Sequence, residues 1–141
     1  MGEDLATGNV NRSYSLAATS SAIFTFTLFF LYPKFASGEA HRLLFQATIV
    51  VMGVATFSFV FASFCYYCSS AGRFADSERA SFARRGDRLW LLGYNLLLLA
   101  PSMILVSIGL FAVGSVWLAL WLAYLLFVIR YFPKVETVRG G

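Results

Sequence analysis

Charged residues are scarce in this chain of 141 residues: Asp, Glu, Lys and Arg make up 13% of it, against about 25% in a typical soluble domain. None of them occurs in residues 13–33, 43–72 or 89–129. A soluble protein of this length has too little interior to bury so much apolar surface. The scarcity excludes an ordinary soluble domain, and the continuous apolar runs exclude the alternating strands of a membrane barrel. The three windows therefore indicate helices that lie in lipid.

Residues that carry chemistry are equally few. The chain has one histidine, His41, and two cysteines, Cys65 and Cys68. Cysteines at this spacing occur in zinc and redox sites, but zinc takes about four ligands and a thioredoxin-like site needs a βαβ setting. The windows also lack the ionisable residues that proton-coupled carriers, haem sites and intramembrane hydrolases use. We therefore expect no enzyme activity, no metal, no cofactor, and a packing role for both cysteines.

The lengths of the three windows set the number of membrane spans. About 20 apolar residues cross the hydrocarbon core, so the windows of 21 and 30 residues hold one span each and the window of 41 residues holds two. The longest window breaks most readily at residues 109–115, where Gly109, Gly114 and Ser115 favour a turn. The sequence predicts a single all-α domain over residues 1–141, an up-down-up-down four-helix transmembrane bundle. Its spans are 15–32, 43–66, 89–109 and 113–131, with a cytoplasmic loop at 67–88.

The basic residues predict how these spans are oriented. One side has only Lys34 and Arg42, whereas the other side has nine of the eleven basic residues. Basic residues accumulate on the cytoplasmic side, so we expect both termini there and an integral, multi-pass protein of a bacterial-type inner (plasma) membrane. The positive charge would then meet anionic lipid headgroups and requires no nucleic acid. The nine are Arg12, Arg73, Arg79, Arg84, Arg85, Arg88, Arg130, Lys134 and Arg139.

The central loop contains a second helical pattern. Asp76 or Ser77 is expected to cap a helix that continues towards residue 88. This helix would either extend the third span or lie on the lipid headgroups. Its arginines are either a solvated face that enforces orientation or a dedicated contact for lipid or a partner. The candidate headgroup contacts are Arg79, Arg84, Arg85 and Arg88.

The first predicted span has small and hydroxyl-bearing residues at helical spacing. Ala17, Ser21 and Thr25 follow one another every four residues, and Ala18 and Ala22 repeat that spacing one residue later. Small residues allow helix backbones to approach closely, and hydroxyls can bond across the contact. The pattern favours a helix-packing face, with the lining of a pore in an oligomer as the sharper alternative.

The third and fourth spans have polar and aromatic patterns of their own. Asn95 and Ser102 are candidates for helix packing or pore lining, and we expect Asn95 to bond to another helix, because a buried amide needs partners. Pro101 removes a backbone donor and is expected to kink the third span. The fourth span has one bulky face, which suits either a helix–helix seam or contact with lipid or a hydrophobic ligand. That face consists of Trp117, Trp121, Tyr124, Val128 and Tyr131.

These observations favour a small non-enzymatic membrane protein that self-associates, with an oligomeric channel or membrane-perturbing effector as its sharper form. An accessory or assembly subunit of a larger membrane complex is the second hypothesis, for which the aromatic fourth span would be the docking face. A small carrier or lipid-active enzyme is disfavoured, because the spans lack intramembrane charge and a catalytic set.

Overall fold

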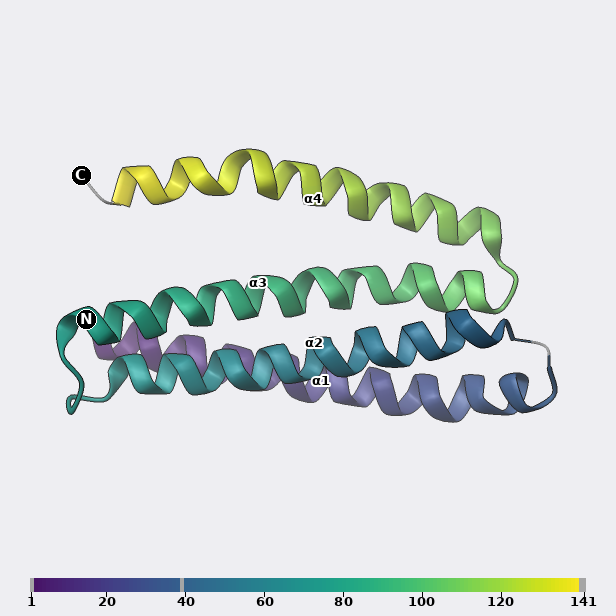
Figure 1. Ribbon diagram of the computed structural model, residues 1–141, viewed down its shortest axis with the longest axis horizontal. Helices are drawn as coiled ribbons and strands as arrows, with labels where there is room; N and C mark the ends of the chain where they lie inside the picture. Colours follow the sequence, from purple (N-terminus) through teal and green to yellow (C-terminus); the bar gives the residue numbers. More distant parts are fainter. Residues whose placement is uncertain (1, 39, 140–141) are drawn as a thin grey trace.

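The computed structural model contains four long helices that run antiparallel in chain order (Figure 1). It describes the backbone of residues 2–38 and 40–139, and the side chains of residues 7–38 and 40–130. The helices are α1 (Gly2–Ala36), α2 (Arg42–Ser70), α3 (Asp76–Ser107) and α4 (Phe111–Arg139). No strand occurs in the described backbone. All four helices are long and apolar enough to cross a membrane.

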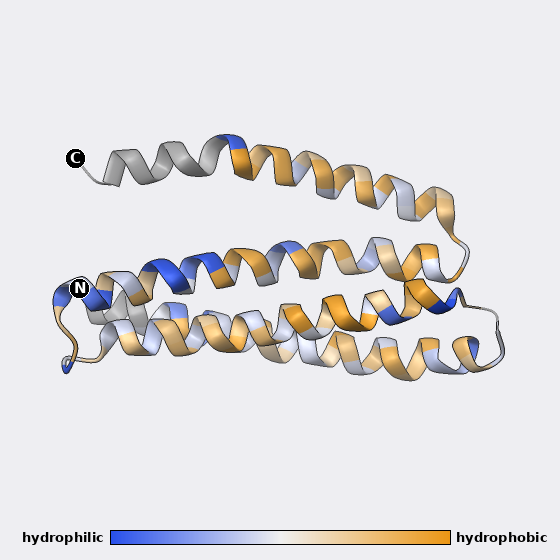
Figure 2. Ribbon diagram, viewed as in Figure 1, coloured by the Kyte–Doolittle hydropathy of each residue, from blue (hydrophilic) through white to orange (hydrophobic). Residues whose placement is uncertain are grey.

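The helices extend beyond the predicted spans at the end that carries the first residues of α1 and the α2–α3 loop. The 35 residues of α1 correspond to about 52 Å at 1.5 Å per residue, against about 30 Å for a hydrocarbon core. The polar segment before the first span is therefore helical. Residues 76–88 likewise form the first turns of α3, so the loop helix extends the third span. Figure 2 shows these turns as hydrophilic, while the middle of each helix is largely hydrophobic.

The start of α3 differs from the prediction in its capping residue. Ala75 is the N-cap, and Asp76 is already helical. The carboxylate of Glu78 accepts a hydrogen bond from the Ala75 N–H at 3.1 Å. A glutamate three residues after the cap can satisfy the exposed backbone donor in this way, so the cap residue itself needs no polar side chain.

The seam between α2 and α3 pairs large residues with small ones. Every seventh residue of α2 on this face is large and buried, and every seventh residue of α3 is small and buried. A Cβ atom added at Gly86 would lie 2.9 Å from Tyr66 Cε1, and one at Gly93 would lie 3.1 Å from the Ala55 carbonyl oxygen and 3.2 Å from the Phe59 ring. The α2 set is Phe45, Met52, Phe59 and Tyr66, and the α3 set is Gly86, Gly93, Ala100 and Ser107.

Helix α1 packs mainly on α2 through a face of small and hydroxyl-bearing residues. Across this contact the hydroxyls of Ser20 and Thr56 are hydrogen-bonded at 2.9 Å. Thr56 also donates to the Met52 carbonyl oxygen at 3.0 Å. Steps of four, three, seven and four residues keep the buried set on one face of the helix. That set is Ser13, Ala17, Ser20 and Thr27, followed by the large Leu31 near the end of the helix.

Within the described residues, helix α4 contacts α3 and no other helix. The turn before it spans residues 108–110, and Gly109 adopts a φ of +83°, which glycine reaches without strain. Gly114, expected in the turn, instead lies within α4, where a Cβ would come 2.6 Å from Val106 Cγ2. It therefore serves the close approach of α4 to α3 rather than the turn.

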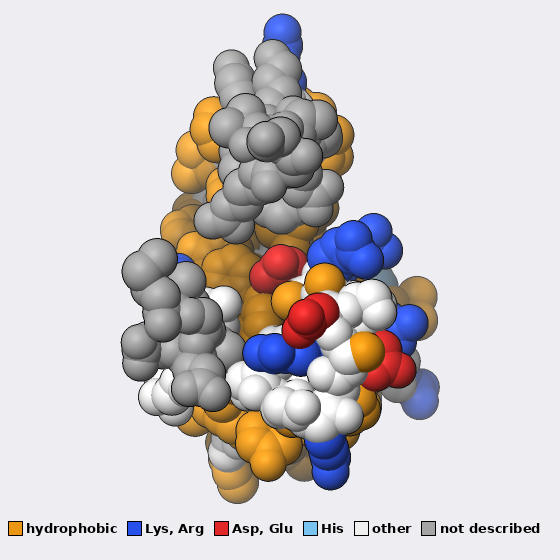
Figure 3. All heavy atoms as spheres, turned by 90° about the vertical axis from the view of Figure 1, so that its left-hand side faces the viewer, with side chains coloured by type: hydrophobic (Ala, Val, Ile, Leu, Met, Phe, Trp, Pro, Cys, Tyr) orange, Lys and Arg blue, Asp and Glu red, His pale blue; other side chains and the backbone are white. Residues whose placement is uncertain are grey.

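The four helices form an open arrangement rather than a closed bundle, because no contact joins α1 and α4 in the part of the chain that the structure describes. Figure 3, an end-on view, shows the last helix standing away from the other three. The accessible surface is 9337 Å², against about 7,300 Å² for a globular monomer of this mass. The excess is apolar side chains on the outer faces, as expected of helices that lipid covers.

Candidate functional site

The face of α3 that meets α4 contains three cross-helix hydrogen bonds. Ser102 Oγ donates to the Gly114 carbonyl oxygen at 2.8 Å. Trp117 Nε1 donates to the Leu98 carbonyl oxygen at 3.1 Å, and Trp121 Nε1 to that of Asn95 at 2.9 Å. Each of these two indole N–H groups thus finds a carbonyl acceptor on α3. Ser102 is buried, and its bond to α4 is that of a packing residue.

Three residues of the aromatic face of α4 contact α3. The Tyr124 ring meets the Tyr94 ring edge-on, with centroids 6.1 Å apart, and Trp117 and Trp121 bond to the α3 backbone. Tyr131 lies outside the described side chains. Trp117 is still 41% exposed, so α3 covers part of this face.

Asn95 does not make the interhelical bond that we expected of its side chain. Its Nδ2 donates to the Leu91 carbonyl oxygen of its own helix at 2.8 Å. Its Oδ1 is buried and has no partner among the described residues. A polar side chain can satisfy its donor on the preceding helical turn, which makes a neighbouring helix unnecessary. The contribution of Asn95 to α4 comes instead from its backbone carbonyl, through Trp121.

The structure separates the three small residues that the sequence grouped in the first span. Ala17 is buried against α2, whereas Ser21 and Thr25 are exposed. Each four-residue step turns the helix by about 40°, so three residues spaced by four drift off a common face. Thr25 Oγ1 donates to the Ser21 carbonyl oxygen at 2.9 Å. Ser21 Oγ has no hydrogen-bond partner in the described part of the chain.

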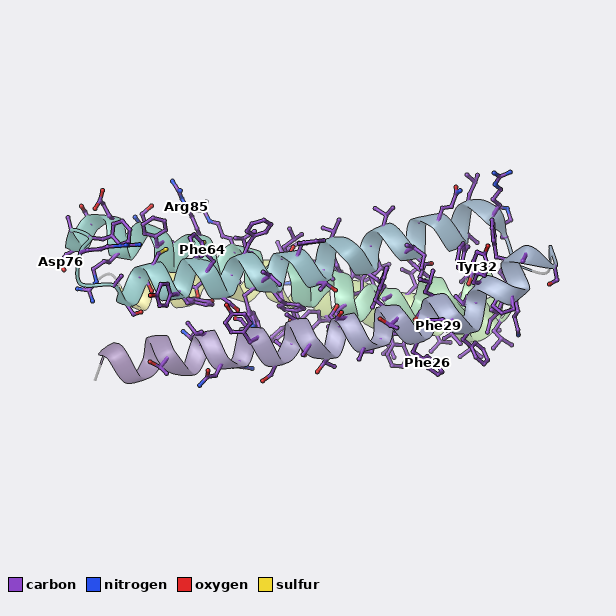
Figure 4. All side chains as sticks on the ribbon, turned by 90° about the horizontal axis from the view of Figure 1, so that it is seen from below. Phe26, Phe29, Tyr32, Phe64, Asp76 and Arg85 are labelled. Carbon is purple, nitrogen blue, oxygen red and sulfur yellow. The ribbon has the colours of Figure 1, made fainter. Side chains whose placement is uncertain are left out.

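An exposed face of small residues remains on α1, away from α2. It consists of Ala18, Ser21, Ala22 and Thr25, and all four are exposed. Their spacing of i, i+3, i+4 and i+7 places them side by side on a helix. We call these residues the α1 small face. Further towards the α1–α2 connection the exposed surface becomes bulky, with Phe26, Phe29 and Tyr32 projecting from the helix (Figure 4).

The end of the molecule that carries the α2–α3 loop gathers the charged side chains (Figure 3). Arg12 of α1 lies over the Trp90 ring of α3, 5.1 Å from its centroid, and Trp90 stacks on Tyr94 at 5.2 Å. A cation above an aromatic face is attracted by the ring quadrupole. This contact ties the start of α1 to α3 beside the α3–α4 seam.

The four arginines of the candidate headgroup contact have different surroundings. Arg79 is half-buried; its Nε donates to the Ser69 carbonyl oxygen at 2.9 Å, and its Nη1 lies 3.4 Å from Asp76 Oδ1. It fastens the end of α2 to the start of α3. The other three, Arg84, Arg85 and Arg88, are exposed.

The two cysteines lie near the end of α2, far from the histidine, which precedes the start of that helix. Cys65 is half-buried and Cys68 buried, and both are free thiols. His41 is exposed and precedes α2 in an extended conformation. Within the described residues, no group of three or more His, Cys, Asp or Glu side chains is placed to hold a metal ion.

Sequence reasoning missed two features. One is the seven-residue repeat of small residues in α3, which is visible in the sequence but gains meaning only beside the large repeat of α2. The other is the bond from the Tyr66 hydroxyl to Asp87 Oδ1, at 2.7 Å. No sequence signal pairs these two residues, because they meet only once the hairpin register is known.

Comparison with protein-family models, with curated proteins and with solved structures found no match. The functional argument therefore rests on the residues and contacts described above.

Proposed function

We propose that this protein is a non-enzymatic, multi-pass membrane protein that acts through self-association, with the α1 small faces of two copies in contact. The proposal keeps both termini in the cytoplasm, on the side favoured by the basic residues. It treats the four apolar helices as membrane spans and the outer apolar surface as lipid-covered.

The observation that supports this proposal is the exposure of the α1 small face. Exposed apolar residues need no protein partner in a membrane, but small residues leave the backbone accessible to a second helix. Ser21 adds a hydroxyl with no partner in the described structure, and lipid cannot supply one. A neighbouring copy of α1 offers both close packing and an acceptor for this hydroxyl.

The aromatic face of α4 supports self-association over an accessory role. That face was the docking surface on which the accessory hypothesis relied, and Trp117, Trp121 and Tyr124 of this face already contact α3. The remaining exposed surface of α4 carries large aliphatic and aromatic side chains together with the small residues Ala112, Ser115, Ala119 and Ala123. Lipid accommodates the large apolar side chains, and Ser115 is an exposed polar residue without a hydrogen bond in the described part of the chain.

A channel is the sharper form of the proposal. The hydroxyl hydrogens of Thr19 and Thr25 are used by carbonyl oxygens of their own helix, while their lone pairs remain available on exposed positions. In an assembly that brings several α1 helices together, the Thr19 oxygen, which lies beside the α1 small face and not within it, would face ions or water. Flux across vesicles that contain the purified protein tests this form separately.

The mass of the detergent-solubilised protein tests the self-association. We expect a defined homo-oligomer, and Ser21→Leu should shift it towards the monomer because a bulky side chain separates the backbones. Phe30→Leu, at an exposed and bulky position about 120° around the helix from Ala18, is the matched control and should leave the mass unchanged. A monomer that co-purifies with another protein would instead support the accessory role and refute the proposal.

A further inference from the structure

The carboxylates near the α2–α3 loop all have local partners. Asp76 pairs with Arg79, at 3.4 Å. Glu78 accepts a hydrogen bond from the backbone N–H of Ala75, and Asp87 accepts one from the Tyr66 hydroxyl. These three are the acidic residues whose side chains the structure describes in this region. None of them neutralises a cation beyond Arg79.

Three arginines of α3 are consequently left without an anionic partner among the described residues. Arg84, Arg85 and Arg88 are exposed and make no ion pair or hydrogen bond there. At 100° per residue they fall within an arc of about 100° on the helix, and we call them the arginine triad. Figure 4 shows Arg85 reaching outward, at the same end of the molecule as Asp76.

The triad stands at the level where a membrane surface would lie. Trp90 follows Arg88 by two residues, and tryptophan favours the membrane–water interface. Leu92, one turn further along from Arg88, is 47% exposed and begins the apolar outer surface of α3. On the adjacent helix, Phe61 and Phe64 are exposed as well. Along α3, guanidinium groups are thus followed by apolar side chains, in the same order as the phosphate and the acyl chains of a phospholipid.

We propose that the arginine triad binds the phosphate of an anionic phospholipid in the cytoplasmic leaflet. Guanidinium groups match phosphate oxygens with paired N–H donors, and Arg is preferred over Lys for this geometry. The acyl chains run along the outer surface of α3 from Leu92, beside the exposed phenylalanines of α2. The lipid phosphate neutralises positive charge of the arginine triad that no described side chain neutralises. This site involves other helices than the α1 small face and does not depend on self-association.

Native mass spectrometry of the purified protein tests this site. The probes are phosphatidylglycerol and phosphatidylcholine with the same acyl chains, so that only the headgroup charge differs. We expect the wild type to prefer phosphatidylglycerol. The variant Arg84→Gln/Arg85→Gln/Arg88→Gln should lose about a hundredfold in affinity for it, at roughly 1 kcal/mol per arginine. Its affinity for phosphatidylcholine, whose phosphate charge is offset by the choline cation, should fall much less.

The matched control removes the same charge elsewhere, in Lys34→Gln/Arg42→Gln/Arg73→Gln, and should keep the preference. Arg84→Lys/Arg85→Lys/Arg88→Lys, which preserves charge and solubility, should retain part of it. Inorganic phosphate should not displace the lipid, since it lacks the acyl chains. A preference that persists without the triad, or that falls equally in the control, would overturn the proposal.

Discussion

Gly93 and Gly114 lie where α3 meets its two neighbours, and in each case a side chain would need space that is already taken. At Gly93 the obstacles are a backbone carbonyl oxygen and a buried phenylalanine ring. At Gly114 they are the Val106 side chain and the backbone of α3. Neither obstacle is the free end of a flexible side chain, so the glycines set the distance between the helices.

Gly93→Ala is therefore expected to destabilise the protein, although alanine is the better helix former. The gain in helix propensity is about 1 kcal/mol, and overpacking costs about 1–3 kcal/mol. Gly53→Ala is the matched control, since a Cβ there meets nothing within 4 Å, and it should leave stability unchanged or raise it. Thermal unfolding in detergent measures both. A higher melting temperature for Gly93→Ala would contradict the packing described here.

Asn95 has a donor that is satisfied and an acceptor that is not. Asn95→Leu removes a buried oxygen without a partner, at the loss of one bond worth about 1 kcal/mol, so stability should stay equal or rise. Asn95→Asp replaces the donor to Leu91 by a second oxygen, and placing a carboxyl there costs up to about 3 kcal/mol. The melting temperature of Asn95→Leu should thus be higher than that of Asn95→Asp. Intact folding combined with lost ion flux in Asn95→Leu would instead make Asn95 a functional residue.

Among the four helices, α4 has the fewest packing contacts with the rest of the protein. It has one neighbour, and just 6% of its most apolar window is buried, against 39% for α2. The cross-helix bonds from Ser102, Trp117 and Trp121 supply its specific contacts. Local stability follows the number of such contacts, so α4 should open before the other helices.

Trp121→Phe keeps an aromatic ring but removes the bond to the Asn95 carbonyl oxygen, which is worth about 1 kcal/mol. Amide hydrogen exchange should become about fivefold faster in α4 and stay unchanged in the α1–α2 seam. Leu126→Ala, at an exposed position of the same helix, should leave exchange in α4 nearly as it was. Faster exchange throughout the protein would show that α4 is not a separate cooperative unit.

The helices were predictable where the sequence of a single segment is enough to identify them. Charge-free windows revealed four apolar helices, whereas the turn, at residues 108–110, overlaps only the first two residues of the predicted 109–115 segment. The helix ends were less predictable, because hydrophobicity marks the lipid-spanning part while the helix continues into water. Contacts such as Tyr66 with Asp87, or Ser20 with Thr56, depend on the register between two helices. Asn95 was misjudged for a related reason, because its own backbone competes with a neighbouring helix for the amide.

The whole molecule is polarised, with most of its basic residues at one end. If the membrane orients the protein by this asymmetry, reporter fusions after Gly141 and within the α1–α2 connection at Ser37 should report opposite compartments, the first cytoplasmic. Fusions in the α2–α3 loop should agree with Gly141. A shared compartment for Gly141 and Ser37 would remove the four-span arrangement.

The proposed self-association rests on the exposed α1 small face, where small residues leave the helix backbone accessible to a second helix. Cross-linking in native membranes tests this most directly, with single cysteines in a background where Cys65 and Cys68 are replaced by serine. A two-fold contact between α1 helices brings like residues together, so Ala22→Cys should form a disulfide-linked dimer under mild oxidation. Phe30→Cys, exposed on another side of α1, should remain monomeric. Equal cross-linking at both positions, or none at Ala22→Cys, would contradict self-association through this face.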